Sequence, residues 1–125
     1  MNLYVHFPFC RSKCAYCALR SSASSSAGER AAYSLRIAAE LERLFASRPG
    51  EPLATIYFGG GTPALCDLTP ILAVLAPRIL PTAEFTVELN PLDVTPAFLR
   101  QLRLGGANRL SMGVQIGRAS CRERV

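Results

Sequence analysis

Short apolar segments with strand character alternate along this chain with longer segments of helical periodicity. Four segments combine aromatic, aliphatic or β-branched residues and lie beside Pro, Gly or Asn, which is typical of strands. The expected strands are residues 3–7, 54–58, 84–89 and 109–114. The expected helices are residues 29–48, residues 67–78, and a third that opens at Thr95-Pro96 and ends at Gly105-Gly106. This alternation predicts an α/β fold whose parallel strands are joined by helical crossovers.

The most unusual residues of the chain follow the carboxyl ends of these strands. A cysteine-rich loop follows the first strand, a run of glycines follows the second, and an Asn-Pro pair follows the third. Active sites of (β/α) barrels lie at that end, so we predict a partial TIM-like (β/α) barrel, truncated after about four βα units. A chain of 125 residues is too short to close such a barrel. A doubly wound sheet is the alternative fold.

Three of the five cysteines, Cys10, Cys14 and Cys17, crowd into the loop after the first strand. Three thiolates in one loop repel one another unless a cation neutralises them, so the spacing indicates a metal centre. A structural zinc site needs four ligands, and the candidates for the fourth, His6 and Cys66, are not at a usual spacing. An iron–sulfur cluster held by three cysteines instead keeps one iron open. We therefore expect a [4Fe–4S] cluster whose open iron chelates the methionine moiety of S-adenosylmethionine, with zinc or uncoordinated thiols as alternatives.

A run of three glycines, Gly59 to Gly61, follows the second strand and leads into Thr62-Pro63. Glycine lets the backbone approach a ligand closely with its N–H and C=O groups bare. The run is not a phosphate-binding loop, because no Lys-Ser or Lys-Thr follows it. Alone it is equally compatible with a tight turn. Its place one strand after the cysteine loop favours a ligand site.

Five side chains near these loops are candidates for binding or for simple packing. Glu88, near the end of the third strand, and Gln115, at the end of the fourth, are expected to hydrogen bond ribose hydroxyls, or else to be solvated strand-end residues. Tyr16 is expected to pack on an adenine ring, with loop packing as the alternative. We expect Cys66 to be a buried thiol. We expect His6 to be packed or hydrogen-bonded rather than a metal ligand.

Composition and charge argue against a nucleic-acid partner and against a membrane-spanning segment. The formal net charge is +5, but the basic residues are scattered and no basic run is interleaved with aromatics, so no nucleic-acid partner is expected. No apolar run reaches the roughly 18 to 20 residues of a spanning helix, so no transmembrane segment is expected. The N-terminus has neither the basic region nor the apolar region of a signal peptide. The expected compartment is therefore the cytoplasm.

The last ten residues, 116–125, break the apolar pattern that precedes them. Their sequence, IGRASCRERV, corresponds codon by codon to a translated sequencing-library adapter. We therefore expect residues 1–115 to be the N-terminal part of one core domain, and residues 116–125 to be a non-native tail from adapter read-through. A genuine basic tail is the alternative, and sequencing of the locus through codon 116 distinguishes the two.

Five motifs, in this order, resemble those of one family. They are LYVHFPFC at 3–10, CAYC at 14–17, IYFGGGTP at 56–63, TVELNP at 86–91 and NRLSMGVQ at 108–115. The family is that of the radical S-adenosylmethionine (radical SAM) proteins that includes oxygen-independent coproporphyrinogen III oxidase and the heme chaperone HemW. The resemblance covers residues 2 to 115 and implies a partial (β/α) barrel that forms part of a radical SAM core domain.

The resemblance also implies roles for individual residues. It makes Cys10, Cys14 and Cys17 the ligands of the [4Fe–4S] cluster. The residues that fall where the family contacts S-adenosylmethionine are Tyr4, Tyr16, Gly60, Gly61, Thr62, Glu88 and Gln115.

Two positions after the third cysteine depart from the family patterns. Leu19 stands where the true oxidases usually carry a further cysteine, which argues against coproporphyrinogen decarboxylation. Ala18 stands where the chaperone-like members commonly carry Asp. The Asn90-Pro91 pair after Glu88 also resembles the chaperone branch more than the oxidase branch.

Three functional hypotheses follow, in order of preference. The first is a HemW-like protein that binds heme and delivers it to acceptor proteins, with an electron donor as a further partner. The second is an oxidoreductase that decarboxylates coproporphyrinogen III in porphyrin biosynthesis, so that a porphyrinogen replaces heme as the ligand. The third, from another class, is a zinc-stabilised interaction module without redox chemistry.

Overall fold

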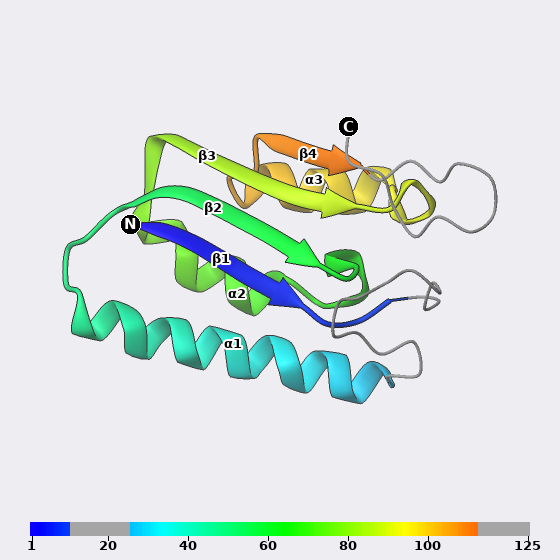
Figure 1. The fold of residues 1–125 in the computed structure, drawn as a ribbon, viewed down its shortest axis with the longest axis horizontal. Coiled ribbons are helices and arrows are strands. Elements are labelled where there is room, and N and C mark those ends of the chain that lie inside the picture. Colours follow the sequence, from blue (N-terminus) through cyan, green and yellow to red (C-terminus); the bar gives the residue numbers. More distant parts are fainter. Residues whose placement is uncertain (11–25, 113–125) are drawn as a thin grey trace.

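A computed structural model describes residues 1–10 and 26–112 as a four-stranded parallel sheet with helical crossovers (Figure 1). The strands are β1 (Asn2–Phe7), β2 (Leu53–Gly60), β3 (Ile79–Leu89) and β4 (Arg109–Met112). The helices are α1 (Ala27–Ser47), α2 (Thr69–Leu75) and α3 (Pro96–Leu104), with short 3₁₀ turns at Pro63–Leu65, Ala76–Arg78 and Pro91–Asp93. The order of strands in the sheet, β1-β2-β3-β4, is their order in the chain.

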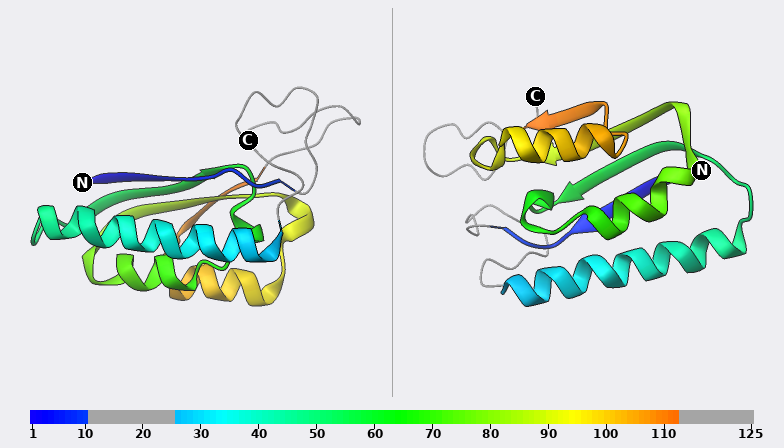
Figure 2. Two further views of the ribbon diagram at one scale, coloured as in Figure 1. Left: turned by 90° about the horizontal axis from the view of Figure 1, so that it is seen from below. Right: turned by 180° about the vertical axis from the view of Figure 1, so that it is seen from behind.

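All three helices cover the same face of the sheet (Figure 2). A doubly wound sheet reverses its strand order and carries helices on both faces, so the described part of the chain has the architecture of a partial barrel. The predicted α/β fold is confirmed, and the doubly wound alternative is wrong.

The core lies between the sheet and this layer of helices. Alternate residues of β1, β2 and β3 point into it, and the rings of Phe7, Phe58 and Phe85 pack in a row across these strands. Their centroids are 5.3 Å apart between the first pair and 5.0 Å apart between the second. All three side chains have no solvent exposure, so their burial makes a large contribution to stability.

The opposite face of the sheet, on which residues 1–10 and 26–112 place no helix, is lined by polar and aromatic side chains. We call it the open face. The pairing register places two rows of residues across it, because side chains alternate between faces along each strand. One row consists of Tyr4, Tyr57, Thr86 and Arg109. The next row, nearer the carboxyl ends, consists of His6, Gly59, Glu88 and Ser111.

Local signals set the ends of two helices. Ser26 caps α1 in a capping box, since its hydroxyl accepts from the Glu29 N–H while the Glu29 side chain accepts from the Ser26 N–H. The predicted N-cap Thr95 is confirmed, because its hydroxyl accepts from the Phe98 N–H at 3.1 Å. The chain leaves α3 through Gly106, whose φ of 103° favours glycine.

The boundary between α2 and β3 differs from the prediction. The expected helix over 67–78 is α-helical only from Thr69 to Leu75 and closes with a 3₁₀ turn that contains Pro77. Proline lacks the N–H that would continue the helix. The expected strand over 84–89 begins earlier, at Ile79, because Leu53 of β2 pairs with Ile79 before the register shifts.

Several predictions concern residues outside the described ranges. The end of the fourth expected strand and the tail 116–125 both lie there, so the assignment of that tail stays a prediction. Within the described ranges, no helix combines the length and the apolar character that crossing a membrane requires.

Candidate cofactor site

The predicted site residues that the structure describes, apart from Tyr4 in the middle of β1, meet at the carboxyl end of the sheet. All four strands are parallel, so their carboxyl ends lie along one edge (Figure 1). Cys10 follows β1, the glycine run closes β2, and Glu88 is the penultimate residue of β3. Chain segments far apart in the sequence therefore converge on one edge, as barrel sites require.

Cys10 is the predicted cluster ligand that the structure describes. Its side chain is buried and forms no disulfide within the described residues. The other two predicted ligands, Cys14 and Cys17, lie outside the described residues, as do the predicted cofactor contacts Tyr16 and Gln115.

The glycine loop runs along the segment that leads to Cys10. The Gly61 N–H donates to the Phe7 carbonyl oxygen at 2.5 Å, and the Thr62 N–H donates to the Phe9 carbonyl oxygen at 2.6 Å. These bonds extend the pairing of β1 and β2 beyond the two strands. The position of Cys10 is therefore tied to the glycine loop through its neighbour Phe9.

Each glycine of the loop is required by the packing of the protein itself. A Cβ on Gly61 would lie 2.3 Å from the Phe9 carbonyl oxygen, and one on Gly60, whose φ is 98°, would lie 2.5 Å from the His6 ring. A Cβ on Gly59 would lie 2.7 Å from the Tyr57 ring. Contacts this short force a shift of the neighbouring atoms, so the run has a structural reason in addition to any role in ligand binding.

Glu88 is a buried carboxylate rather than the solvated strand-end residue that the sequence left open. Its side chain is only 2% exposed. Oε2 accepts from the Tyr57 hydroxyl at 2.5 Å, and Oε1 accepts from the Gly60 N–H at 3.2 Å. The carboxylate thus links β3 to the glycine loop, in accordance with the rule that a buried charge needs hydrogen-bond donors.

Tyr4 lies on the open face and is 55% exposed. Its hydroxyl is hydrogen-bonded to Nδ1 of His6 at 3.1 Å, and its ring stacks on the Tyr57 ring with centroids 5.9 Å apart. His6 is therefore hydrogen-bonded, as expected, and it also lies against Gly60. Tyr4 keeps an exposed aromatic surface beside His6 and Tyr57.

Two tyrosines with contacts to the site were not among the predicted site residues. Tyr57 joins Tyr4 to Glu88, as described above. Tyr33 of α1 donates from its hydroxyl to the His6 carbonyl oxygen, and its ring meets the Phe9 ring edge-on at a centroid distance of 5.3 Å. Strand alternation alone places Tyr57 on the face opposite its buried neighbours, which is a signal that could have identified it.

Cys66 is a buried thiol, as the sequence indicated. It follows the 3₁₀ turn after the glycine loop. Burial raises the pKa of this thiol, and the opposing effects of the Ser34 hydroxyl and the Arg30 guanidinium are smaller. At neutral pH the protonated form dominates, and a protonated thiol is a poor nucleophile and metal ligand.

The described donor groups fit an amphiphilic nucleoside, and no group of three or more His, Cys, Asp or Glu side chains among the described residues could hold a metal ion by itself. The donor groups are the buried sulfur of Cys10 and the backbone of the glycine loop, where added Cβ atoms would collide with their neighbours. The adjoining side chains are a carboxylate, two phenols and an imidazole. The carboxylate and phenol oxygens can accept hydrogen bonds from hydroxyl or ammonium groups, while an exposed ring can pack on a planar base.

Comparisons with known proteins agree with this arrangement. The family model described as "Radical SAM superfamily" matches residues 4–125. Oxygen-independent coproporphyrinogen III oxidase of Paracoccus denitrificans is 37% identical over 122 residues, which are 92% of this chain and 27% of that protein. Heme chaperone HemW of Mycobacterium tuberculosis is 32% identical over 121 residues, which are 91% of this chain and 31% of that protein.

A solved structure is also similar. It is that of coproporphyrinogen III oxidase (HemN) from Escherichia coli, a radical SAM enzyme, with a TM-score of 0.73 and 30% sequence identity. The similarity covers 91% of this chain and 27% of that one. The chain therefore spans less than a third of the length of the relatives that it matches.

Proposed function

The chain belongs to the radical SAM superfamily, and from this premise we propose that it is part of a heme-metabolism protein that binds a [4Fe–4S] cluster and S-adenosylmethionine. Cys10, Cys14 and Cys17 hold the cluster. The residues that bind S-adenosylmethionine are Tyr4, Tyr16, Gly60, Gly61, Thr62, Glu88 and Gln115. The observation that carries this proposal is the convergence of Cys10, the glycine loop and Glu88 at one edge of the sheet.

The cluster, when bound, supplies an electron for the reductive cleavage of the sulfonium of S-adenosylmethionine. The residues of this chain bind and orient S-adenosylmethionine. The glycine loop offers backbone groups without side chains, and the Glu88 carboxylate, which Tyr57 and Gly60 orient, offers acceptor oxygens for ribose hydroxyls. Tyr4 presents its exposed ring at the edge of the same site.

For the whole protein we favour a HemW-like heme chaperone over an oxidase. The observation that favours it is Leu19, which stands where the oxidases of the family usually carry a further cysteine. Coproporphyrinogen III oxidation is the second candidate, and the similarity to proteins of that name at 37% and 39% identity favours it. Heme, acceptor proteins and an electron donor are the partners that the first proposal requires.

Anaerobic reconstitution of the full-length protein tests the cluster. We expect iron and sulfide in the ratio of a [4Fe–4S] cluster, and loss of its visible absorption in Cys10→Ser and Cys14→Ser. Cys66→Ser is the matched control and should retain full absorption, because this thiol follows the glycine loop in the chain and is not part of the cysteine-rich loop. Stoichiometric zinc without sulfide would refute the cluster and favour the zinc-stabilised module.

Two assays on the full-length protein separate chaperone from oxidase. The chaperone proposal predicts heme binding, seen as a shifted Soret band, and no conversion of coproporphyrinogen III in the presence of S-adenosylmethionine and a reductant. Efficient release of carbon dioxide from coproporphyrinogen III would instead establish the oxidase.

A further inference from the structure

Tyr57 occupies the centre of the candidate site although no motif of the sequence gives it a role. It lies on β2, between β1 and β3, and its register partners are Tyr4 on one side and Thr86 on the other. Its side chain projects from the open face, where the neighbouring strands carry Tyr4 and Glu88. Among the described residues, Tyr57 is therefore placed to contact predicted cofactor-binding residues on both adjacent strands.

The hydroxyl and the ring of Tyr57 make different contacts. The hydroxyl donates to Glu88 Oε2 at 2.5 Å, a charge-assisted hydrogen bond in a position where the carboxylate is 2% exposed. The ring stacks on the Tyr4 ring, with an interplanar angle of 21°. One side chain thus orients both a buried acceptor and an exposed aromatic surface.

The side chains of Tyr57 and Glu88 lie together beside Gly59. A Cβ added to Gly59 would lie 2.7 Å from Tyr57 Cε1 and 3.1 Å from Glu88 Cδ, so the absence of a side chain there lets the two groups meet. The second oxygen of Glu88 is held by the Gly60 N–H. Tyr57 and Gly60 together therefore fix the plane of the Glu88 carboxylate.

We propose that Tyr57 is a positioning residue that orients Glu88 toward the ribose of S-adenosylmethionine and supports Tyr4 beside it, a role that rests on the proposed function. Without the hydroxyl, Oε2 of Glu88 loses the hydrogen bond from Tyr57, which is one of the contacts that orient the carboxylate. The carboxylate is then oriented less firmly toward the ligand, so binding weakens.

Equilibrium binding of S-adenosylmethionine to the reconstituted full-length protein tests this role. Tyr57→Phe keeps the ring stacked on Tyr4 and removes the hydroxyl, so we expect binding to weaken about fivefold, as for the loss of one net hydrogen bond. Tyr57→Leu removes both contacts and should weaken binding further. Thr55→Val is the control, because it removes a hydroxyl from an exposed position of the same strand and face. It should leave the affinity unchanged.

A second readout separates positioning from general support of the fold. An analogue of S-adenosylmethionine whose ribose lacks its hydroxyls should bind more weakly than S-adenosylmethionine to the wild-type protein. Tyr57→Phe should reduce the ratio of these two affinities several-fold, because it disturbs Glu88, the residue that recognises the hydroxyls. In a Glu88→Ala background, Tyr57→Phe should have no further effect on affinity, because Tyr57 acts through Glu88.

The outcomes distinguish this inference from the proposal on which it rests. If the wild-type protein fails to bind S-adenosylmethionine, the proposed function is wrong and the inference falls with it. If the wild-type protein binds and Tyr57→Phe binds equally well, the role of Tyr57 is refuted while the proposed function stands. If Tyr57→Phe lowers the affinity for S-adenosylmethionine and for the analogue without ribose hydroxyls by the same factor, Tyr57 supports the fold and does not position Glu88.

Discussion

Gly61 donates its backbone N–H to the carbonyl oxygen of Phe7 at 2.5 Å, which ties the glycine loop to the segment that enters the cysteine loop. The next bond, from Thr62 to Phe9, lies one residue before Cys10. Two loops that the sequence separates by about 50 residues are thereby held in one register. The glycine loop thus positions Cys10, the first predicted cluster ligand, in addition to its own backbone groups.

Gly61→Ala tests this coupling. Its Cβ would lie 2.3 Å from the Phe9 carbonyl oxygen and 2.7 Å from the Phe7 carbonyl oxygen. Both neighbours are backbone atoms, so the two segments must separate, at a cost of about 2–3 kcal/mol in the free energy of unfolding. We expect the reconstituted full-length variant to hold less iron than the wild type, measured together with urea denaturation.

Gly28→Ala is the matched control for that experiment. Gly28 lies in the first turn of α1, and a Cβ there would come no closer than 3.8 Å to the Ser26 hydroxyl oxygen. An alanine in a helix is more stable than a glycine by about 0.5–1 kcal/mol, so this variant should be slightly stabilised and keep its iron. Equal iron content and equal stability to urea in the two variants would show that Gly61 is not needed for the approach of the two loops.

The fold could be predicted from the sequence because its signals are local. The apolar pattern of β1 and the caps at Thr95 and Gly106 each depend on residues close in the chain, and the structure confirms them. The junction of α2 and β3 could not be predicted as well. There, the early start of β3 at Ile79 depends on pairing with Leu53, a residue of another strand.

The site could be predicted only in part, for the same physical reason. Cys10, Gly60 and Glu88 stand out by residue type and by their place at strand ends. The burial of Glu88 depends on a hydroxyl from Tyr57, and the fixed path of the glycine loop depends on the Phe9 carbonyl group. Such pairings are set by register between strands, which a single sequence does not display.

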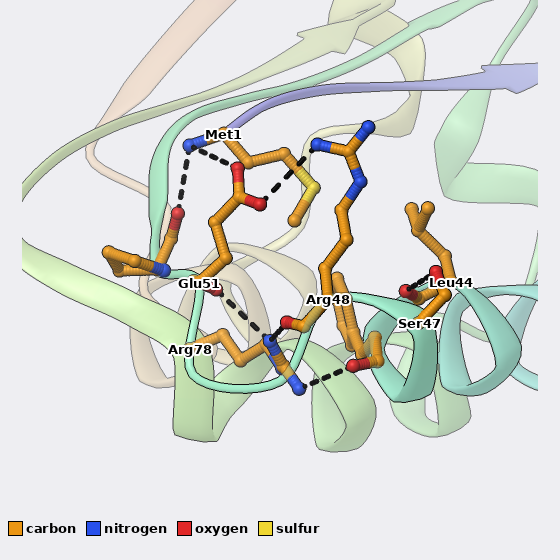
Figure 3. Close-up of polar contacts among 8 residues, drawn as sticks. Met1, Leu44, Ser47, Arg48, Glu51 and Arg78 are labelled. Atoms are coloured by element: carbon orange, nitrogen blue, oxygen red, sulfur yellow. Dashed lines mark hydrogen bonds and ion pairs between the residues drawn. The ribbon is translucent and has the colours of Figure 1, made fainter.

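Arg78 directly precedes β3, at the amino-terminal side of the sheet and so at the opposite end of the strands from the glycine loop. Figure 3 shows its polar contacts. Its guanidinium donates to the carbonyl oxygens of Arg48 at 2.8 Å, Glu51 at 3.1 Å and Phe45 at 2.9 Å. It also lies over the Phe45 ring at 4.5 Å from the centroid. One side chain thus satisfies carbonyl groups at the end of α1 and holds the turn into β2.

Replacement of Arg78 should therefore affect stability without affecting the site. Arg78→Met keeps the length of the side chain and loses all three hydrogen bonds, so we expect a loss of about 2–4 kcal/mol in the free energy of unfolding. Arg78→Lys keeps the charge but not the planar fork, and should lose an intermediate amount. Urea denaturation measures the losses. A change in S-adenosylmethionine affinity of the folded Arg78→Lys protein would contradict the separation of the two regions.

The capping box at the start of α1 should be a measurable part of its stability. Ser26→Ala leaves the Glu29 N–H without its acceptor, for which we expect a loss of about 1 kcal/mol in thermal or urea unfolding. Ser47→Ala is the control at the other end of the same helix, where the hydroxyl donates to the Leu44 carbonyl oxygen at 2.7 Å (Figure 3). This control should lose less than about 0.5 kcal/mol, since its site is exposed. Equal losses would mean that the box does not set the start of α1.

The buried thiol of Cys66 and the half-buried phenol of Tyr33 predict a loss of stability at alkaline pH. Burial is the main cause that raises the pKa of the Cys66 thiol above its ordinary value of 9.0, and it is also the main cause that raises the pKa of Tyr33 above 10.0. Above pH 9 the unfolded chain therefore releases protons that the folded chain still holds. The free energy of unfolding must fall as the pH rises through this window, and it is unaffected by these groups below it.

Cys66→Ala isolates the contribution of the thiol. We expect the wild-type protein to lose more stability than the variant when urea denaturation is compared between about pH 8 and about pH 10, because the variant has no thiol to titrate. Tyr33→Phe should reduce the slope chiefly above about pH 10. The same burial predicts slow alkylation of Cys66 by iodoacetamide at neutral pH, with fast alkylation only after unfolding. A pH profile of Cys66→Ala that parallels the wild type would show that the thiol titrates normally in the folded protein.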